Sequence, residues 1–261
     1  MYAFEFVKPA TIAEAVKALA DEDAQALGGG QTLIPTLKQR LASPSALVSL
    51  NGIADLKGVA VEGRELRIGG GTTHATVARE ARTYPALAAL AGHIGDPAVR
   101  NRGTIGGSLA NNDPSADYPA AALASGATIV TNAREIAADD YFQGMFTTAL
   151  EPGEIITAVR FPIPQKANYQ KFAQPASRFA LVGVFVAKFA DGVRVAVTGA
   201  SESGVFRWSE AEAALGGNFS ADAVKGLKAD ADGMIGDLHG TPEYRAHLIG
   251  VLTARAVAAA A

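Results

Sequence analysis

Apolar positions recur along the chain with two different spacings, and together they predict a protein that mixes helices and strands. Helical spacing predicts a helix over residues 11–21, and Thr11 and Glu14 form a capping box at its start. Short apolar runs predict strands over residues 24–27 and 46–50. The chain therefore opens with alternating helix and strand.

Between these two strands, Leu33, Leu37 and Leu41 recur every four residues. This spacing predicts a second helix that starts near Thr32, with Pro35 tolerated in its first turn. The first lobe is therefore expected to be a small α/β unit over residues 1–55, with a glycine turn where its second strand meets this helix.

The middle of the chain is expected to form a second, larger α+β lobe over residues 56–163. Helices are predicted over residues 85–93 and 118–125, whereas the polar, glycine-rich residues 100–108 are predicted to form a loop. Two prolines in residues 161–165 indicate a linker, because proline interrupts a continuing element.

Residues 168–261 are expected to form a C-terminal α+β domain. The apolar run Leu181–Ala187 predicts a strand buried on both faces. Helices are predicted over residues 208–215, 221–230 and 241–258. Because this part carries no glycine turn and no charge constellation, a packing role is favoured over a direct functional one.

Composition narrows the function classes. The net charge of the 261 residues is -3, which argues against nucleic acid as a partner. No stretch is apolar enough for a membrane span, and the first residues do not resemble a signal peptide, so a cytoplasmic protein is expected. Cysteine is absent, which excludes cysteine-bound iron–sulfur clusters on this chain, and the four histidines have no metal-ligand spacing, so no metal site is expected.

Glycine is enriched, with 28 residues, and much of the excess lies in three clusters. Gly28-Gly29-Gly30-Gln31-Thr32 joins a predicted strand to a predicted helix, where glycine permits positive φ and close approach of an anion to backbone N–H groups. It is not a P-loop, because no Lys-Ser/Thr pair follows, and it lacks the third glycine of a dinucleotide fingerprint. A plain tight turn explains it about equally well.

A second glycine-rich cluster, Thr104 to Ser108, favours an anion-binding site over a plain tight turn. Two glycine turns that face each other across one cleft could bind both phosphates of a diphosphate through N–H and hydroxyl donors. Asp113 or Asp117 would then suit a ribityl or ribose hydroxyl. The alternative for either aspartate is that it caps the helix that begins at Tyr118.

Two long motifs carry a family resemblance. Residues 26–35 (ALGGGQTLIP) and residues 100–117 (RNRGTIGGSLANNDPSAD) closely resemble the two FAD motifs of molybdenum hydroxylase flavoprotein subunits. These are the medium subunits of the xanthine dehydrogenase and aerobic carbon monoxide dehydrogenase type. Residues 69–74 and 176–184 also resemble that family, so the resemblance runs nearly the whole chain.

The resemblance implies a mixed α and β fold. It comprises a two-lobe FAD-binding domain of PCMH type (vanillyl-alcohol-oxidase-like) and a C-terminal α+β domain of the carbon monoxide dehydrogenase flavoprotein type. FAD would lie between the two lobes, and its isoalloxazine ring would reach toward the C-terminal domain.

The same resemblance implies roles for individual residues. The pyrophosphate cradle would comprise Gly28, Gly29, Gly30, Gln31, Thr32, Leu33, Ile34, Thr104, Gly106, Gly107 and Ser108. Thr73 belongs to the third glycine-rich motif, and Asp117 matches the aspartate that binds a flavin hydroxyl. Ile94 replaces an aromatic residue that stacks on the flavin in xanthine dehydrogenases, and Ile156 matches an apolar contact near the ring. Some relatives place a basic residue near the flavin just after the strand that contains Lys171; this chain has Ala173 there, and Lys171 is not assigned that role.

As such a subunit, the chain would carry FAD and act as an oxidoreductase component without a catalytic base of its own. A large partner subunit would hold molybdopterin, and a small one would hold two 2Fe–2S clusters, in a dimer of heterotrimers. Electrons would pass from the iron–sulfur subunit to the flavin and on to a terminal acceptor.

Two other functions remain open at this point. A stand-alone flavin oxidase or dehydrogenase of the same fold would turn over a small substrate by itself, with His74 or His93 as a possible flavin tether. A non-catalytic nucleotide-binding assembly subunit would be colourless when purified.

Overall fold

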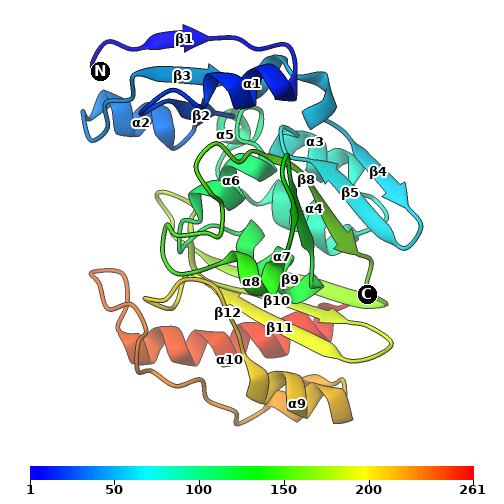
Figure 1. Cartoon of the computed structure of the whole chain (residues 1–261). Helices are drawn as coiled ribbons and strands as arrows, with labels where there is room; N and C mark the ends of the chain where they lie inside the picture. Colours follow the sequence, from blue (N-terminus) through cyan, green and yellow to red (C-terminus); the bar gives the residue numbers. More distant parts are fainter.

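The computed structural model describes residues 1–261. Three sheets follow one another along the chain, each with its own helices, from the N-terminal lobe at the top of Figure 1 to the C-terminal domain at the bottom. The mixed α and β fold class expected from the sequence is confirmed. None of the helices combines the length and apolarity needed to cross a lipid bilayer.

The N-terminal lobe is built on a parallel three-stranded sheet in the order β1-β3-β2. The predicted capping box forms in part. The Thr11 hydroxyl accepts from the Glu14 N–H, whereas the Glu14 carboxylate accepts from the Ala10 N–H and not from that of Thr11. The elements are β1 (Glu5–Val7), α1 (Ile12–Ala18), β2 (Gln25–Leu27), α2 (Leu33–Lys38), β3 (Ala46–Ser49) and the 3-10 turns η1 (Leu50–Gly52) and η2 (Ala54–Leu56).

The second helix is shorter than the leucine spacing predicts. It ends at Lys38, because Arg40 takes a left-handed φ of 60° and the Leu41 N–H donates to the Thr36 carbonyl. Leu41 is therefore outside the helix and 74% exposed, so its assignment to the apolar face was wrong.

The second lobe is built on an antiparallel five-stranded sheet in the order β4-β5-β8-β6-β7. Its elements are β4 (Val59–Glu62), β5 (Glu65–Gly69), α3 (His74–Glu80), α4 (Pro85–Gly92), α5 (Pro97–Arg100), α6 (Ile105–Asn111), α7 (Tyr118–Ser125), β6 (Thr128–Thr131), β7 (Glu135–Ala137), α8 (Ala138–Tyr141) and β8 (Ile156–Pro162). The predicted loop at residues 100–108 is wrong in its second half, because α6 begins at Ile105 with Thr104 as its cap.

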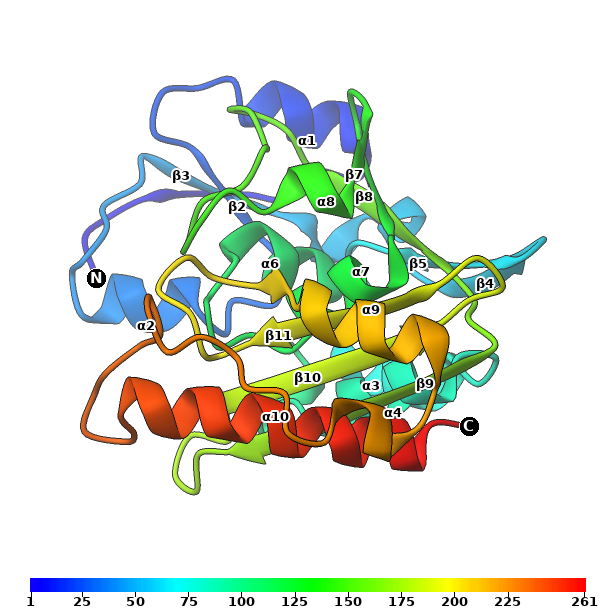
Figure 2. The same ribbon diagram turned by 90° about the horizontal axis from the view of Figure 1, so that it is seen from below.

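The C-terminal domain is an antiparallel four-stranded sheet in the order β12-β11-β10-β9, covered on one face by α9 and α10 (Figure 2). Its elements are β9 (Lys166–Ala173), β10 (Ala180–Lys188), β11 (Val193–Thr198), β12 (Phe206–Arg207), α9 (Ser209–Gly217), η3 (Ala221–Val224) and α10 (Pro242–Ala259). The helix predicted over residues 221–230 is only the turn η3, which stops before Gly226 with its positive φ of 89°.

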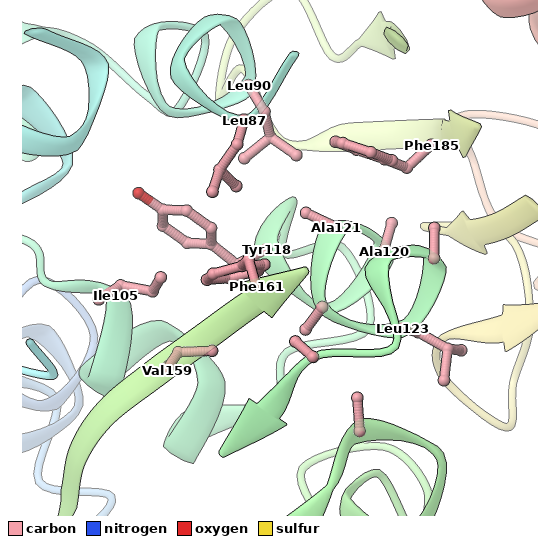
Figure 3. Packing of buried hydrophobic residues seen from close by; sticks show 14 of the residues in the cluster. Leu87, Leu90, Ile105, Tyr118, Ala120, Ala121, Leu123, Val159, Phe161 and Phe185 are labelled. Atoms are coloured by element: carbon pink, nitrogen blue, oxygen red, sulfur yellow. The ribbon is translucent and has the colours of Figure 1, made fainter. Parts of the chain in front are cut away.

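Strand β10 is buried on both faces from Ala180 to Ala187, as its apolar run predicts. One face packs with α9 and α10, and the other faces α7 of the second lobe. Every residue of α7 is buried, and its alanines let the helix lie close to β10 and β11. Figure 3 shows Ala120 and Ala121 near Phe185 of β10, with Tyr118 beside Leu87 and Phe161. The second lobe and the C-terminal domain therefore share one hydrophobic core.

Candidate functional site

A cavity of about 620 Å³ lies between the N-terminal lobe and the second lobe. Its size falls within the roughly 300–1,000 Å³ typical of small-molecule sites. The two glycine turns form part of its wall, and Ser177, Arg178 and Phe179 extend it to the C-terminal domain. The expectation that both glycine turns face one cleft is therefore confirmed.

The first turn, Gly28–Thr32, connects β2 to α2 and offers backbone donors to the cavity. None of its five N–H groups donates a hydrogen bond within the protein. Four of its carbonyls do accept hydrogen bonds. Side chains donate to the Gly28 and Gly29 oxygens at 3.1 and 3.3 Å, and the helix that follows donates to those of Gly30 and Thr32. A run of unpaired N–H groups at a cavity wall suits an anionic ligand.

The two glycine turns also touch each other. A Cβ placed on Gly29 would lie 2.5 Å from the Gly103 Cα and closer still to the Arg102 carbonyl oxygen. A Cβ on Gly28 would lie 3.0 Å from the Thr104 hydroxyl oxygen. Glycine at position 29 is therefore required by the close approach of the two lobes.

The second turn differs from the first in its hydrogen bonding. The N–H groups of Ile105, Gly106 and Gly107 donate to the Thr72 carbonyl, the Gly70 carbonyl and the Thr104 hydroxyl at 2.8–3.1 Å. The Ser108 N–H also donates inside the helix. The expectation that both turns supply free N–H groups is thus wrong for these four residues. Polar groups of this turn that remain near the cavity are the hydroxyls of Thr104 and Ser108.

The third glycine cluster, Gly69–Gly71, packs between η2 and β8 beside the cavity. The Gly71 N–H donates to the Leu56 carbonyl at the end of η2 at 2.7 Å, and the Gly70 N–H donates to the Thr157 carbonyl of β8 at 2.8 Å. A Cβ on Gly70 would overlap the Ile156 carbonyl oxygen. The sequence marked this cluster without assigning it a role, and the structure shows a close-packed junction.

Asp117 lines the cavity at the start of α7 and is 4% exposed. It makes no capping hydrogen bond to α7, so the capping alternative is wrong for this residue. Burial raises the pKa of its carboxyl, and the nearby ammonium of Lys171 opposes that rise. Asp113 also lines the cavity, and its carboxylate accepts from the Ser115 N–H at 2.8 Å in a local turn.

Another part of the cavity wall is apolar. Ile94 and Ile156 line it together with Leu150 and Phe179. Arg100 fixes the main chain here, because its guanidinium donates to the Ile94 and Gly95 carbonyls at 3.1 and 2.9 Å. This apolar region suits a flat ring system.

Two expected site residues do not line the cavity. Ile34 packs with Leu27 and Leu37 in the core of the N-terminal lobe, because it is on the inner face of α2. Thr73 caps α3, and its hydroxyl accepts from the Thr76 N–H at 3.3 Å. The other thirteen expected residues do line the cavity.

His74 follows Thr73 and lines the cavity from a buried position. Burial, reinforced by the charge of Arg100, lowers its pKa from 6.5 to about 4. Its Nδ1 has no hydrogen-bond partner, and its ring packs against Tyr118 with the centroids 5.3 Å apart. It is therefore a neutral packing residue at pH 7.

Comparisons with known proteins agree with this geometry. Residues 2–164 match the family described as the FAD binding domain in molybdopterin dehydrogenase. The chain is 35% identical to the carbon monoxide dehydrogenase medium chain of Afipia carboxidovorans, over 97% of this chain and 95% of that one. It is also 35% identical to the nicotine 6-hydroxylase medium subunit of Paenarthrobacter nicotinovorans, over 98% and 96%.

Solved structures of related enzymes have the same fold over nearly the whole chain. A reconstituted carbon monoxide dehydrogenase from Oligotropha carboxidovorans superposes with a TM-score of 0.88 at 33% identity, covering 98% of this chain and 97% of that one. Quinoline 2-oxidoreductase from Pseudomonas putida 86 superposes with a TM-score of 0.88 at 30% identity, covering 98% and 96%.

The cavity fits FAD. Five unpaired N–H groups offer donors to a diphosphate, the hydroxyls of Thr104 and Ser108 lie at the same cavity, and an apolar wall is available for the ring. The chain belongs to the family of FAD-binding medium subunits of molybdenum hydroxylases, as an oxidoreductase component.

Proposed function

We propose that this chain binds FAD between its N-terminal and second lobes and transfers electrons from an iron–sulfur subunit to a terminal acceptor. The observation that carries the proposal is the cavity wall formed by the first glycine turn, whose five N–H groups are unpaired. When bound, FAD supplies one- and two-electron redox chemistry. The chain's own residues bind it, orient it and exclude water from it.

Each part of the chain would have a separate task. The first lobe (residues 1–55) supplies N–H donors for the diphosphate, and the second (56–163) supplies hydroxyls, Asp117 and the apolar wall. The C-terminal domain (168–261) covers the ring end through the loop that contains Phe179. The proposed cofactor-binding residues are Gly28, Gly29, Gly30, Gln31, Thr32, Leu33, Ile94, Thr104, Gly106, Gly107, Ser108, Asp117 and Ile156.

The partners would be a large molybdopterin subunit and a small subunit with two 2Fe–2S clusters, assembled as a dimer of heterotrimers. The relatives named as medium chains and medium subunits support a multi-subunit complex. Since this chain has no cysteine, cysteine-bound clusters must be held by another chain. Substrate oxidation would then take place on a partner.

The test is to purify the full chain alone and with its native partners. We expect the isolated chain to carry FAD, and to be reduced by a partner's substrate only when the molybdopterin and iron–sulfur subunits are present. Turnover of a small substrate by the isolated chain would instead support a stand-alone oxidase. A colourless chain that does not bind added FAD would refute the proposal.

A further inference from the structure

Two side chains of the C-terminal domain, Tyr169 and Lys171, contact the carboxylate of Asp117. Lys171 Nζ lies 2.9 Å from one of its oxygens and 3.0 Å from the other. The Tyr169 hydroxyl donates to the first of these oxygens at 2.5 Å. Neither residue was expected to take part in the site.

The geometry of β9 and β10 brings these groups together. Tyr169 and Lys171 are two residues apart on β9, so their side chains leave the same face of the sheet. Gly183 of β10 pairs with Lys171, and a Cβ there would overlap the Tyr169 hydroxyl. The absence of a side chain at Gly183 therefore gives Tyr169 the room to reach Asp117.

Lys171 has a second partner at the same site. Its ammonium donates to the His93 carbonyl at 3.3 Å, immediately before the cavity residue Ile94. Lys171 and Asp117 have side chains that are only 6% and 4% exposed. A buried carboxylate is strongly disfavoured in its charged form unless a cation and hydrogen bonds compensate it, and here Lys171 provides the cation. Asp117 nevertheless reaches the cavity wall.

We infer that Lys171 is a positioning residue, which keeps Asp117 ionised and aimed as an acceptor for a ribityl hydroxyl of bound FAD. This inference rests on the proposed function, and it assigns part of cofactor retention to the C-terminal domain. A carboxylate has about four lone-pair sites, so Asp117 can hold Lys171 and Tyr169 and still accept one more hydrogen bond from the cofactor.

The experiment measures the FAD dissociation constant of the full chain by equilibrium dialysis from pH 6 to pH 9. The variants are Lys171→Met, Lys171→Arg, Asp117→Asn and the double variant Asp117→Asn/Lys171→Met. Lys166→Met, an exposed lysine at the start of the same strand, is the matched control. A thermal melt of each FAD-free protein shows whether the variant folds.

For Lys171→Met we expect FAD binding to weaken by roughly 10- to 100-fold at pH 6, as for the loss of a hydrogen bond to a charged group. The loss should shrink as the pH rises, because Asp117 regains its charge at higher pH than in the wild type. Lys171→Arg should restore most of the affinity, and both variants that carry Asp117→Asn should lose this pH dependence. The other titratable groups beside Asp117 are Tyr118, Tyr169 and His93, and all four variants retain them.

The possible outcomes separate the two proposals. If Asp117→Asn weakens binding but Lys171→Met has wild-type affinity at every pH, the role of Lys171 is refuted and FAD binding by the chain stands. The inference also fails if Asp117→Asn leaves the affinity unchanged, or if Lys171→Met lowers the melting temperature without altering the pH profile. Failure of the wild type to bind FAD would refute the proposed function itself.

Discussion

Replacing Gly29 with alanine should separate the two glycine turns and release the cofactor. The new Cβ would lie 2.5 Å from the Gly103 Cα and closer to the Arg102 carbonyl, whereas Cβ atoms essentially never approach within 3.0 Å. Restoring ordinary contact distances of about 3.5 Å requires the turns to separate by at least about 1 Å, and by more at the nearer Arg102 oxygen. That displacement takes an N–H donor from about 2.9 Å to about 3.9 Å from a phosphate oxygen, beyond hydrogen-bonding range.

The size of the effect follows from the number of donors lost. A hydrogen bond to a charged group contributes about 1.5–3 kcal/mol, so losing two of the five available donors costs about 3–6 kcal/mol. This corresponds to a rise in the FAD dissociation constant of roughly 10²- to 10⁴-fold. Equilibrium dialysis and the flavin-to-protein ratio after gel filtration measure it directly.

Gly216→Ala is the control, because position 216 is near the end of α9 and a Cβ there meets nothing within 4 Å. That variant should keep its FAD and gain about 0.5–1 kcal/mol of stability from the better helix former. A folded Gly29→Ala protein with the wild-type FAD affinity would show that the turns do not act as the proposed cradle.

Three further predictions concern the frame around the cavity. Gly106→Ala should lower the free energy of unfolding by about 1–3 kcal/mol in urea titrations of FAD-free protein, because its Cβ would lie 2.6 Å from the Gly70 oxygen; an unchanged midpoint would contradict this close packing. Burial lowers the pKa of His74 from 6.5 to about 4, so its contribution to the free energy of unfolding is fully present above pH 6.5 and is lost as the pH falls toward 4. The loss is on the order of 3 kcal/mol. The variant His74→Gln should therefore show a smaller fall in the free energy of unfolding between pH 6.5 and pH 4. Arg245→Met should lower the free energy of unfolding by about 2–4 kcal/mol, because the buried guanidinium donates to the Leu181 and Gly199 carbonyls at 2.7 and 2.8 Å. In the same urea titrations, replacement of the exposed Arg255 by Met should change it by no more than about 0.5 kcal/mol, and an equal loss in both variants would contradict this role of Arg245.

The first glycine turn was predictable as part of the cavity wall because its physical requirement is local. A turn that exposes its backbone N–H groups to an anion favours glycine, and three consecutive glycines, Gly28–Gly30, are visible in the sequence. The apolar run of β10 was predictable for a similar reason, since burial on both faces leaves no polar position.

The partners of Asp117 were not predictable from local pattern. Tyr169 and Lys171 are more than fifty positions away in the sequence, and only the packing of β9 against α4 and of the neighbouring β10 against α7 brings them to Asp117. A weak signal did exist, because Tyr169 and Lys171 share one strand face and a glycine stands in the neighbouring strand. Without the strand register, that glycine could not be matched to Tyr169.

The errors in the helices also have a physical origin. Leu41 fits the four-residue spacing, but spacing alone does not reveal that the chain turns at Arg40. In α6, Gly106 and Gly107 lower helix propensity and therefore predict a loop. The helix forms nonetheless, because Thr104 caps it and the N–H groups of Ile105 and Gly106 donate to the chain beside β5.

The N-terminal lobe has a small hydrophobic core, so its contacts with the second lobe matter for its stability. The two clusters there hold five and three buried residues, whereas the two clusters of the rest of the chain hold thirty and twenty. One of the five, Ile155, comes from the second lobe, so the first lobe completes its core only when docked. A cofactor bound by N–H groups of one lobe and by Asp117 of the other would favour the docked state, because a ligand stabilises the form that binds it. FAD binding should therefore stabilise the contact between the two lobes, and Gly29 of the N-terminal lobe and Lys171 of the C-terminal domain would both contribute to it at the same cavity.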